Sequence, residues 1–370
     1  MNLHTHCDYF DTIVQQKIIN CYGDTEIMSM DYLSKTEKPR NKAMLMIHGY
    51  NDYHYNQELY TRLEKEGFFV IGLTLRNYGK NIISASTQFF PPTGKLNIYF
   101  QEIEWAISFI DQRLGKSVPI YVTAHSTGGL TFSLYLLDCL IKNKVNRFTK
   151  VVLNSPIFDL NDSDMAELGQ EYFSKTMFSC IEHLGFLRYT KLNIPLYPKA
   201  IKDDETGKII EYKMQKGKHY DIIEKNGFKL NPPDRCNIPW MMYDSPKYVA
   251  ISSALTTAYK ELSKKYVENN EKPFITVSTL VLYATDDTLL TPSEIVDGAN
   301  KTFVNLTLYG QPGYHNVFSS SKEQVELFYN AYFAFLADKP VETREREFAF
   351  MEKEPSFSLK SAFPMCSSCL

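Results

Sequence analysis

Runs of apolar residues alternate with amphipathic stretches along the first part of the chain. The apolar runs at 43–47, 68–74 and 151–154 are continuous, which is typical of strands buried on both faces of a sheet. Two stretches between them, 56–66 and 100–110, have their apolar residues at helical spacing. This order of strands and helices predicts a doubly wound, mostly parallel sheet.

Residues 18–32 show a different pattern, in which polar and apolar side chains alternate with Gly23 and Asp24 between the two halves. Alternation with a period of two is typical of strands, and a glycine between two such runs marks a turn. We therefore expect an amino-terminal β-hairpin.

The alternation of strand and helix breaks down at 159–276. This stretch combines a lysine-rich polar segment, proline clusters and one amphipathic helix at 248–266. It is also rich in Phe, Met and Tyr, and a long insertion of this kind is typical of a cap, or lid, over a ligand site. An independently folded domain is the alternative. The earlier pattern then resumes, with strands at 278–284 and 303–309 and helices at 292–300 and 322–336.

The pattern divides the chain into a first core part at 1–158, a cap insertion at 159–276, a second core part at 277–338 and a loosely attached tail at 339–370. The tail ends in CSSCL, and a prenylation box would need a cysteine where Ser367 stands. Acylation of Cys366 or Cys369 remains open.

Residues 120–130, IYVTAHSTGGL, carry the clearest chemical signal in the chain. A short β-branched run stops at a turn of small residues around Ser126, and an apolar helical run follows. This is the pattern of a nucleophile elbow, a sharp turn that presents a serine hydroxyl above the sheet beside the backbone N–H of Thr127. The usual Gly-x-Ser-x-Gly pattern is met by Gly128, whereas Ala124 stands in the first position. An ordinary strand–turn–helix connection is the alternative.

A serine hydroxyl becomes an effective nucleophile when an imidazole takes its proton and a carboxylate orients that imidazole. Where such an elbow occurs, these groups follow along the chain in the order serine, acid, histidine. Asp287 follows the strand that resumes the sheet, and His315 lies in the loop after the last strand. The adjacent Asp286 is the alternative acid. Three other histidines lie beside the serine or within the expected cap and are assigned no catalytic role: His125, His183 and His219.

Composition and charge exclude several classes of function. Hydrophobic residues make up 44% of the chain and aromatic residues 14%, as in an ordinary globular protein. A formal net charge of −3 gives no basic footprint for DNA or RNA, so we expect no nucleic-acid partner. His4, His6 and Cys7 lie close together, but no second ligand cluster accompanies them, and we expect neither a metal nor a cofactor.

The amino terminus lacks the basic and then apolar pattern of a secretory signal. No stretch reaches the run of about 18 apolar residues that a membrane-spanning helix needs. The 7 cysteines are scattered without pairing logic, which favours a reducing, cytoplasmic location.

Six motifs in sequence order resemble those of the serine-aminopeptidase-like, monoglyceride-lipase-related branch of the α/β-hydrolases. They are HGYND from His48, LTLRNYGKN from Leu73, AHSTGGL from Ala124, LNSPIFDL from Leu153, DTLL from Asp287 and GYHNVFSS from Gly313. The resemblance covers about 43–336 and implies an α/β-hydrolase fold with the cap inserted after the strand that follows the nucleophile helix. The family's acid lies in an Asp-Thr-x-Leu motif, which favours Asp287 over Asp286.

One position departs from the family pattern. An aspartate commonly precedes the Leu-Arg-x-Tyr-Gly turn, and Thr74 stands there in this chain. The departure concerns a supporting contact in the turn rather than the three catalytic candidates. The His-Gly pair at His48 also resembles the family loop that supplies the second oxyanion donor, here the N–H of Tyr50 beside that of Thr127. We expect the side chain of His48 itself to tie this loop to its neighbours.

The resemblance implies hydrolysis of a carboxylic ester through an acyl-enzyme, with attack by Ser126, proton transfer by His315 and orientation of His315 by Asp287. An aromatic, Met-containing cap without an evident acidic cluster suits an acyl chain better than a free amino terminus. We therefore expect a small or lipid-like ester such as a monoacylglycerol or lysophospholipid, and leave open a transient contact of the cap with a membrane surface. The alternatives are an acyltransferase or aminopeptidase with the same triad, and a non-catalytic binding scaffold.

Overall fold

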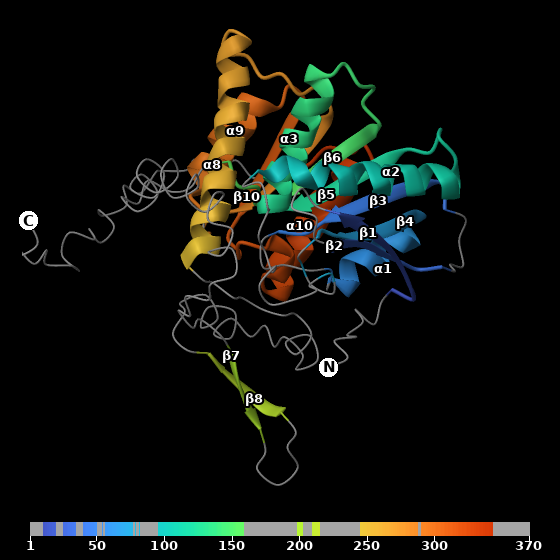
Figure 1. The fold of residues 1–370 in the computed structure, drawn as a ribbon. Helices are drawn as coiled ribbons and strands as arrows, with labels where there is room; N and C mark the ends of the chain where they lie inside the picture. Colours follow the sequence, from blue (N-terminus) through green and yellow to red (C-terminus); the bar gives the residue numbers. More distant parts are fainter. Residues whose placement is uncertain are drawn as a thin grey trace, which may run out of the picture.

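The apolar runs of the sequence form the strands of one eight-stranded sheet (Figure 1). The computed structural model describes residues 10–19, 25–34, 40–49, 54, 56–76, 78, 81, 95–158, 198–202, 209–214, 245–287 and 290–342. In spatial order the strands are β1 (Thr12–Ile19), β2 (Thr25–Tyr32), β4 (Phe68–Thr74), β3 (Lys42–Ile47), β5 (Ile120–His125), β6 (Phe148–Asn154), β9 (Ser278–Ala284) and β10 (Leu306–Gln311).

The sheet is parallel from β4 to β10, whereas β2 runs antiparallel to both β1 and β4. Strands β1 and β2 form the expected amino-terminal hairpin, in which Thr12 pairs with Tyr32. The hairpin begins earlier than the predicted residue 18. Its first strand buries only Ile18, so its exposed Gln and Lys side chains weaken the alternating pattern from which it was predicted.

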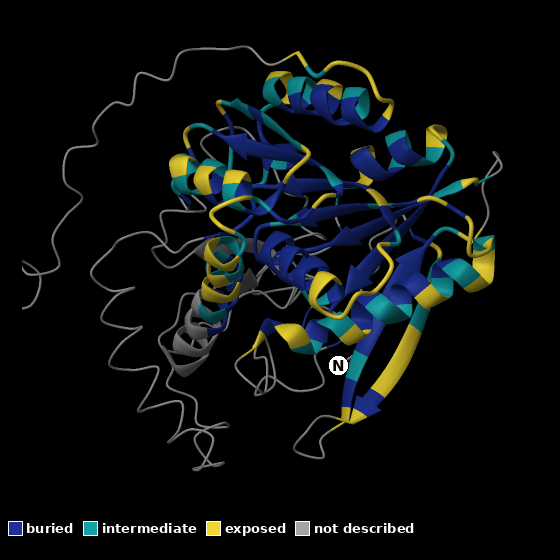
Figure 2. Cartoon of the chain, turned by 90° about the horizontal axis from the view of Figure 1, so that it is seen from above, coloured by how far each residue is buried: buried dark blue, intermediate teal, exposed yellow. Residues whose placement is uncertain are grey.

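Helices cover both faces of the sheet, with α2 (Phe100–Leu114), α3 (Thr127–Ile141) and α9 (Pro292–Thr302) on one side and α1 (Gln57–Lys65) and α10 (Lys322–Leu336) on the other (Figure 1). Successive strand residues point to opposite faces, so Leu45 joins the core cluster on the first side and Met44 the cluster on the second. Seen from above, the central strands are buried, whereas much of the edge strand β1 and the outer sides of the helices are exposed (Figure 2). The doubly wound α/β architecture expected from the sequence is confirmed.

The ends of several helices follow from local sequence. Asn56 caps α1, because its side-chain oxygen accepts the N–H of Leu59 at 3.1 Å. Ser321 and Gln324 form a capping box at the start of α10. Helix α2 ends at Gly115, whose φ of 92° is in the left-handed region that glycine adopts without strain.

Strand β10 begins at Leu306 rather than at the predicted residue 303. Helix α9 extends to Thr302, and the N–H of Phe303 still donates to the carbonyl of Ala299 at 2.9 Å. The next N–H, of Val304, donates to the carbonyl of Ile275 at 2.8 Å, outside the β9–β10 ladder. The apolar residues at 303–304 therefore belong to the helix end and a short bridge, which their hydrophobicity alone does not distinguish from a strand.

The expected cap lies largely outside the described residues. Within it the structure describes β7 (Pro198–Lys202) and β8 (Ile209–Met214), which pair antiparallel, and α8 (Ser245–Glu268). Ala258 and Leu262 of α8 belong to the core cluster on the side of α3. This half of α8 thus packs against the helices α3 and α9 on that side, and the boundaries of the cap stay a prediction. Other parts of the chain that the sequence analysis discussed also lie outside the described residues: Tyr50, His183, His219, the group of His4, His6 and Cys7, and the tail from 343 onward.

Among the helices that the structure describes, none is long and apolar enough to cross a membrane.

Candidate active site

Ser126 lies on a sharp turn between β5 and α3, at the carboxyl end of a central strand. Its φ and ψ of 51° and −118° depart from the ordinary regions for a residue with a side chain. Backbone hydrogen bonds hold it there: its N–H donates to the carbonyl of Asn154 at 2.9 Å, and its own carbonyl accepts the N–H of Gly129 at 2.9 Å and of Ile157 at 3.2 Å. Strain sustained by several bonds at one serine is typical of a functional turn.

The small residues around Ser126 are required by close packing. A Cβ atom added at Gly128 would lie 2.4 Å from the backbone oxygen of His48, closer than real contacts allow. Ala124 is fully buried, so its methyl group is accommodated where the usual pattern has glycine. The turn at Ser126 is therefore packed tightly against the loop that follows β3.

A chain of hydrogen bonds joins Ser126, His315 and Asp287. The Oγ atom of Ser126 lies 2.9 Å from Nε2 of His315, and Nδ1 of His315 lies 2.8 Å from Oδ2 of Asp287. The Asp287 side chain is fully buried, and that of His315 is 14% exposed. When Asp287 is ionised, the proton of the neutral His315 imidazole must lie on Nδ1, where it is donated to the carboxylate. The lone pair of Nε2 can then accept the Ser126 proton.

The two adjacent aspartates have different partners. The other oxygen of Asp287, Oδ1, accepts the N–H of Leu290 at 3.2 Å, which orients the carboxylate. Asp286 points elsewhere, since its Oδ1 accepts the N–H of Gly313 at 2.6 Å. Asp287 is thus the carboxylate that contacts the imidazole, and Asp286 anchors the loop that carries His315.

The loop around His315 is fixed on both sides of the histidine. The N–H of Tyr314 donates to Oγ of Ser320 at 2.9 Å, and the N–H of Val317 donates to Oδ1 of Asn154 at 3.1 Å. Burial and then the nearby Asp286 raise the pKa of the Tyr314 phenol, so this neighbour of His315 stays neutral around pH 7. The loop therefore presents the imidazole from an anchored backbone.

Of the two expected oxyanion donors, the structure describes Thr127. Thr127 is the first residue of α3, where backbone N–H groups have no acceptor within the helix and can bind an anion. Tyr50 lies outside the described residues, although His48 and Gly49 just before it are described. The His48 ring behaves as expected: Nε2 accepts the N–H of Leu75 at 3.2 Å and Nδ1 donates to the carbonyl of Gly49 at 2.8 Å.

Thr74 stands where the family commonly has aspartate, and its buried hydroxyl has no hydrogen-bond partner among the residues that the structure describes. Asn81 supports this turn instead. Its Nδ2 donates to the carbonyls of Thr74 and Leu75 at 2.7 and 3.1 Å, and its Oδ1 accepts the hydroxyl of Ser29 at 2.8 Å. The turn is also held by Arg76, which is buried and bonded through two nitrogens to Glu102 at 2.6 and 2.9 Å.

His125 packs beside the histidine of the hydrogen-bonded chain rather than joining it. Its ring centroid lies 5.1 Å from that of His315, and the side chain is half-buried at the end of β5. Within the described part of the chain, no group of three or more His, Cys, Asp and Glu side chains is placed to hold a metal ion.

Asn154 and Asn316 are site residues that the sequence analysis did not single out. Nδ2 of Asn154 donates to Oδ1 of Asn316 at 2.9 Å, which ties the end of β6 to the residue after His315. The sequence holds two signals that could have indicated them. Asn154 is a polar residue at the end of a buried apolar run, and Asn316 carries a second amide directly after His315.

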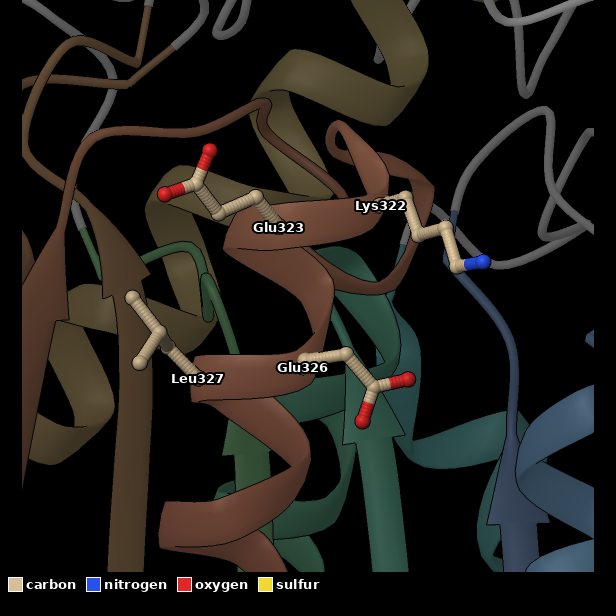
Figure 3. A pocket seen from close by; sticks show the side chains of 4 residues that line it. All are labelled: Lys322, Glu323, Glu326 and Leu327. Carbon is tan, nitrogen blue, oxygen red and sulfur yellow. The ribbon is translucent and has the colours of Figure 1, made fainter.

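The described part of the chain has two hollows that bear on this site. The smaller has about 40 Å³, borders the site and is lined in part by His48, Thr123, Asn154 and Asn316. A larger hollow of about 600 Å³ lies on the outer side of α10, with Lys322, Glu323, Glu326 and Leu327 on its wall (Figure 3). These lining residues include no nucleophile, and Glu326 is paired with Arg62 at 2.5 Å, so we assign no chemistry to the larger hollow.

Solved structures with the same fold include enzymes of different activity. A soluble variant of the monoglyceride lipase from Saccharomyces cerevisiae, in complex with a substrate analogue, is 16% identical over 87% of this chain and 94% of that chain, with a TM-score of 0.57. The monoacylglycerol lipase of Paleococcus ferrophilus is 15% identical over 88% and 99%, with a TM-score of 0.52. Potato (Solanum tuberosum) epoxide hydrolase I is 13% identical over 88% and 100%, with a TM-score of 0.53. These identities establish likeness of fold alone.

Comparison with curated protein sequences found no match. A family model for the alpha/beta hydrolase fold matches residues 42–321, which includes Ser126, Asp287 and His315. Because this match spans well over half of the 370 residues, the chain belongs to the alpha/beta hydrolase fold family.

Proposed function

We propose that this protein is a serine hydrolase that cleaves carboxylic esters through a covalent acyl-enzyme. The observation that carries the proposal is the unbroken chain from Ser126 Oγ through both nitrogens of His315 to the buried carboxylate of Asp287, at 2.9 and 2.8 Å. The position of Ser126 at the start of α3 adds a helix N-terminus where negative charge would develop.

In the first half of the reaction, Oγ of Ser126 attacks the ester carbonyl carbon while Nε2 of His315 takes the hydroxyl proton. The negative charge that develops on the carbonyl oxygen is held by the N–H of Thr127, and we assign the second donor to the N–H of Tyr50. Each such donor typically contributes about 10²–10³ in rate. Asp287 stabilises the imidazolium, which then protonates the departing alcohol as the carbon–oxygen bond breaks.

In the second half, a water molecule attacks the acyl carbon, and His315 takes its proton. Collapse of the second tetrahedral intermediate breaks the bond to Ser126 and returns the proton to its Oγ atom. The products are a carboxylic acid and an alcohol, and every residue regains its starting protonation state.

For the substrate, we propose a lipid-like ester such as a monoacylglycerol or lysophospholipid. Residues 159–276 are rich in Phe, Met and Tyr, which suits an acyl chain. Two solved proteins of the same fold are named as monoglyceride or monoacylglycerol lipases, which is consistent with this choice. A cap of this composition also motivates the proposed transient contact with a membrane surface.

Hydrolysis of p-nitrophenyl esters over a series of acyl chain lengths, together with glycerol release from monoacylglycerols, tests the proposal. We expect turnover to rise with chain length from acetate to medium or long acyl chains and to vanish in Ser126→Ala. A preference for acetate would contradict the lipid-like substrate while leaving a serine esterase. Acyl transfer to an added alcohol in place of hydrolysis would instead indicate an acyltransferase.

A cytoplasmic location stays a proposal based on the scattered cysteines. Within the described residues, Cys139 is a free and buried cysteine, which is compatible with a reducing compartment.

A further inference from the structure

We propose that Asn154 is a positioning residue that sets the distance between Ser126 and His315. This inference rests on the proposed hydrolase function. Asn154 is 2% exposed, touches neither reacting atom through its side chain and lies at the end of β6, next to the strand that leads to Ser126. Its contacts nevertheless reach both halves of the site.

The main chain of Asn154 holds the nucleophile turn. Its carbonyl accepts the N–H of Ser126 at 2.9 Å, in register with the β5–β6 ladder, in which His125 pairs with Asn154. Ser126 sits at a positive φ of 51°, so the turn needs bonds of this kind to stay in place.

The side chain of the same residue holds the histidine loop. Oδ1 of Asn154 accepts the N–H of Val317 at 3.1 Å, and Nδ2 donates to Oδ1 of Asn316 at 2.9 Å. Asn316 and Val317 are the two residues that follow His315. One residue of the sheet therefore bonds the serine through its backbone and the histidine loop through its side chain.

The donor and acceptor atoms of this pair are determined by their neighbours. The backbone N–H of Val317 is only a donor, so the Asn154 atom that faces it must be oxygen, and the other Asn154 atom is then the NH₂ group. The backbone N–H of Phe318 donates to Asn316 Oδ1 at 3.2 Å, which likewise makes that atom an oxygen and an acceptor for Asn154. The amide pair thus has one consistent arrangement, which only another amide or a similar donor–acceptor side chain at position 154 reproduces.

A small hollow borders the amide pair. Asn154 and Asn316 both line this hollow of about 40 Å³, so the two side chains are not packed on every side, although Val317 and Phe318 of the same loop are buried in the core. Without the amide bond the loop has room to shift, and a displacement of about 1 Å between reacting groups can cost about 10²-fold in rate.

The experiment compares Asn154→Ala and Asn154→Asp with the parent protein. The aspartate keeps the volume and the acceptor for Val317 but places an oxygen against Asn316 Oδ1, so it breaks one bond with little loss of packing. For both variants we expect the second-order rate of labelling by a fluorophosphonate and kcat for p-nitrophenyl acetate to fall about 10–100-fold, with KM within about twofold of the parent. All rates are measured well below the melting temperature of each variant.

A matched control and a double variant separate positioning from general destabilisation. Thr302→Val removes another buried hydrogen bond, from Thr302 Oγ1 to the carbonyl of Gly298 at 2.7 Å, in a helix away from Ser126, and should leave the labelling rate of the folded protein within about twofold. Asn154→Ala and Asn316→Ala should each slow labelling, and the double variant should lose much less than the product of the two effects, because both remove the same bond.

Three results would overturn the inference: parental labelling rates in the Asn154 variants, a change confined to KM, or independent multiplicative effects of the two asparagines. These results differ from failure of the proposed function, in which the parent protein itself would not be labelled.

Discussion

Asp287 is bonded through Oδ2 to Nδ1 of His315 at 2.8 Å, although the neighbouring Asp286 differs from it by a single position in the chain. The two aspartates alternate in direction after β9, so Asp286 instead accepts the N–H of Gly313 at 2.6 Å. The Asp287 carboxylate faces the His315 imidazole, and the Asp286 carboxylate faces the backbone of the loop that carries His315. Each aspartate can therefore serve as the control for the other.

Asp287→Asn should lower kcat by about 10³–10⁴-fold, because an amide in place of the carboxylate favours the wrong imidazole tautomer and no longer stabilises its charged form. Asp286→Asn should lower kcat by less than about tenfold, since an amide oxygen can still accept the Gly313 N–H. Steady-state kinetics with one p-nitrophenyl ester measures both. Equal losses, or a larger loss in Asp286→Asn, would show that the acid is wrongly assigned.

Adding a methyl group at Gly128 should impair activity, whereas removing one at Ala124 should mainly lower stability. A Cβ at position 128 would lie 2.4 Å from the His48 oxygen, so Gly128→Ala must displace the turn or the oxyanion loop and should reduce kcat at least about 100-fold. Ala124→Gly removes a buried methyl, and should cost about 1 kcal/mol in the free energy of unfolding while kcat stays within about threefold. Thermal melting and kcat are measured together, and an active Gly128→Ala protein would refute the steric argument.

Arg76 should matter for stability through Glu102. Burial lowers the pKa of the Arg76 guanidinium, but the hydrogen bond and charge of Glu102, together with the charge of Glu26, outweigh burial and raise the pKa above its ordinary value. Arg76→Met leaves two buried carboxylates, Glu102 and Glu26, without the guanidinium that both contact, and should lower the free energy of unfolding by about 3–5 kcal/mol. Removing the Glu102 charge as well, in Arg76→Met with Glu102→Leu, should recover part of this loss, although Glu26 stays buried without Arg76. Urea denaturation measures the difference, and a double variant less stable than Arg76→Met would contradict the account.

Cys139 should be unreactive in the folded protein. Burial raises the pKa of its thiol, and this outweighs the hydrogen bond from Tyr135 that lowers it. The folded state therefore holds the protonated thiol more tightly than the unfolded state, so this group makes the protein less stable as pH rises above the ordinary thiol pKa of about 8.5. Mass spectrometry after brief treatment with iodoacetamide should find Cys139 modified in urea but not in buffer. Rapid modification in buffer would show that the site opens.

The strands and the order of the candidate residues could be predicted from the sequence because their signals are local. Continuous apolar runs marked β4 and β9 at their observed bounds, and the turn around Ser126 carries its chemistry within a few residues. The choice of Asp287 over Asp286 needed the family resemblance, since adjacent aspartates have the same local pattern.

Other features depend on contacts between distant residues. Asn154 and Asn316 are 162 positions apart, and nothing in either local stretch indicates that their amides meet. The start of β10 was predicted three residues early because Phe303 and Val304 are apolar but serve a helix end and a bridge. The turn after β4 is likewise supported by Asn81 rather than by residue 74. This support depends on Ser29, which is distant in the sequence but bonded to Asn81 in the fold.

The central claim is that Ser126 is an activated nucleophile. Its most direct test is labelling of the purified, folded chain with a fluorophosphonate, followed by mass spectrometry to locate the modified residue. The account predicts a single adduct on Ser126, abolished in Ser126→Ala and slowed at least about 10³-fold in His315→Ala. A folded parent protein that is not labelled, or labelled at another residue, would contradict the serine hydrolase mechanism and favour a binding scaffold built on the same fold.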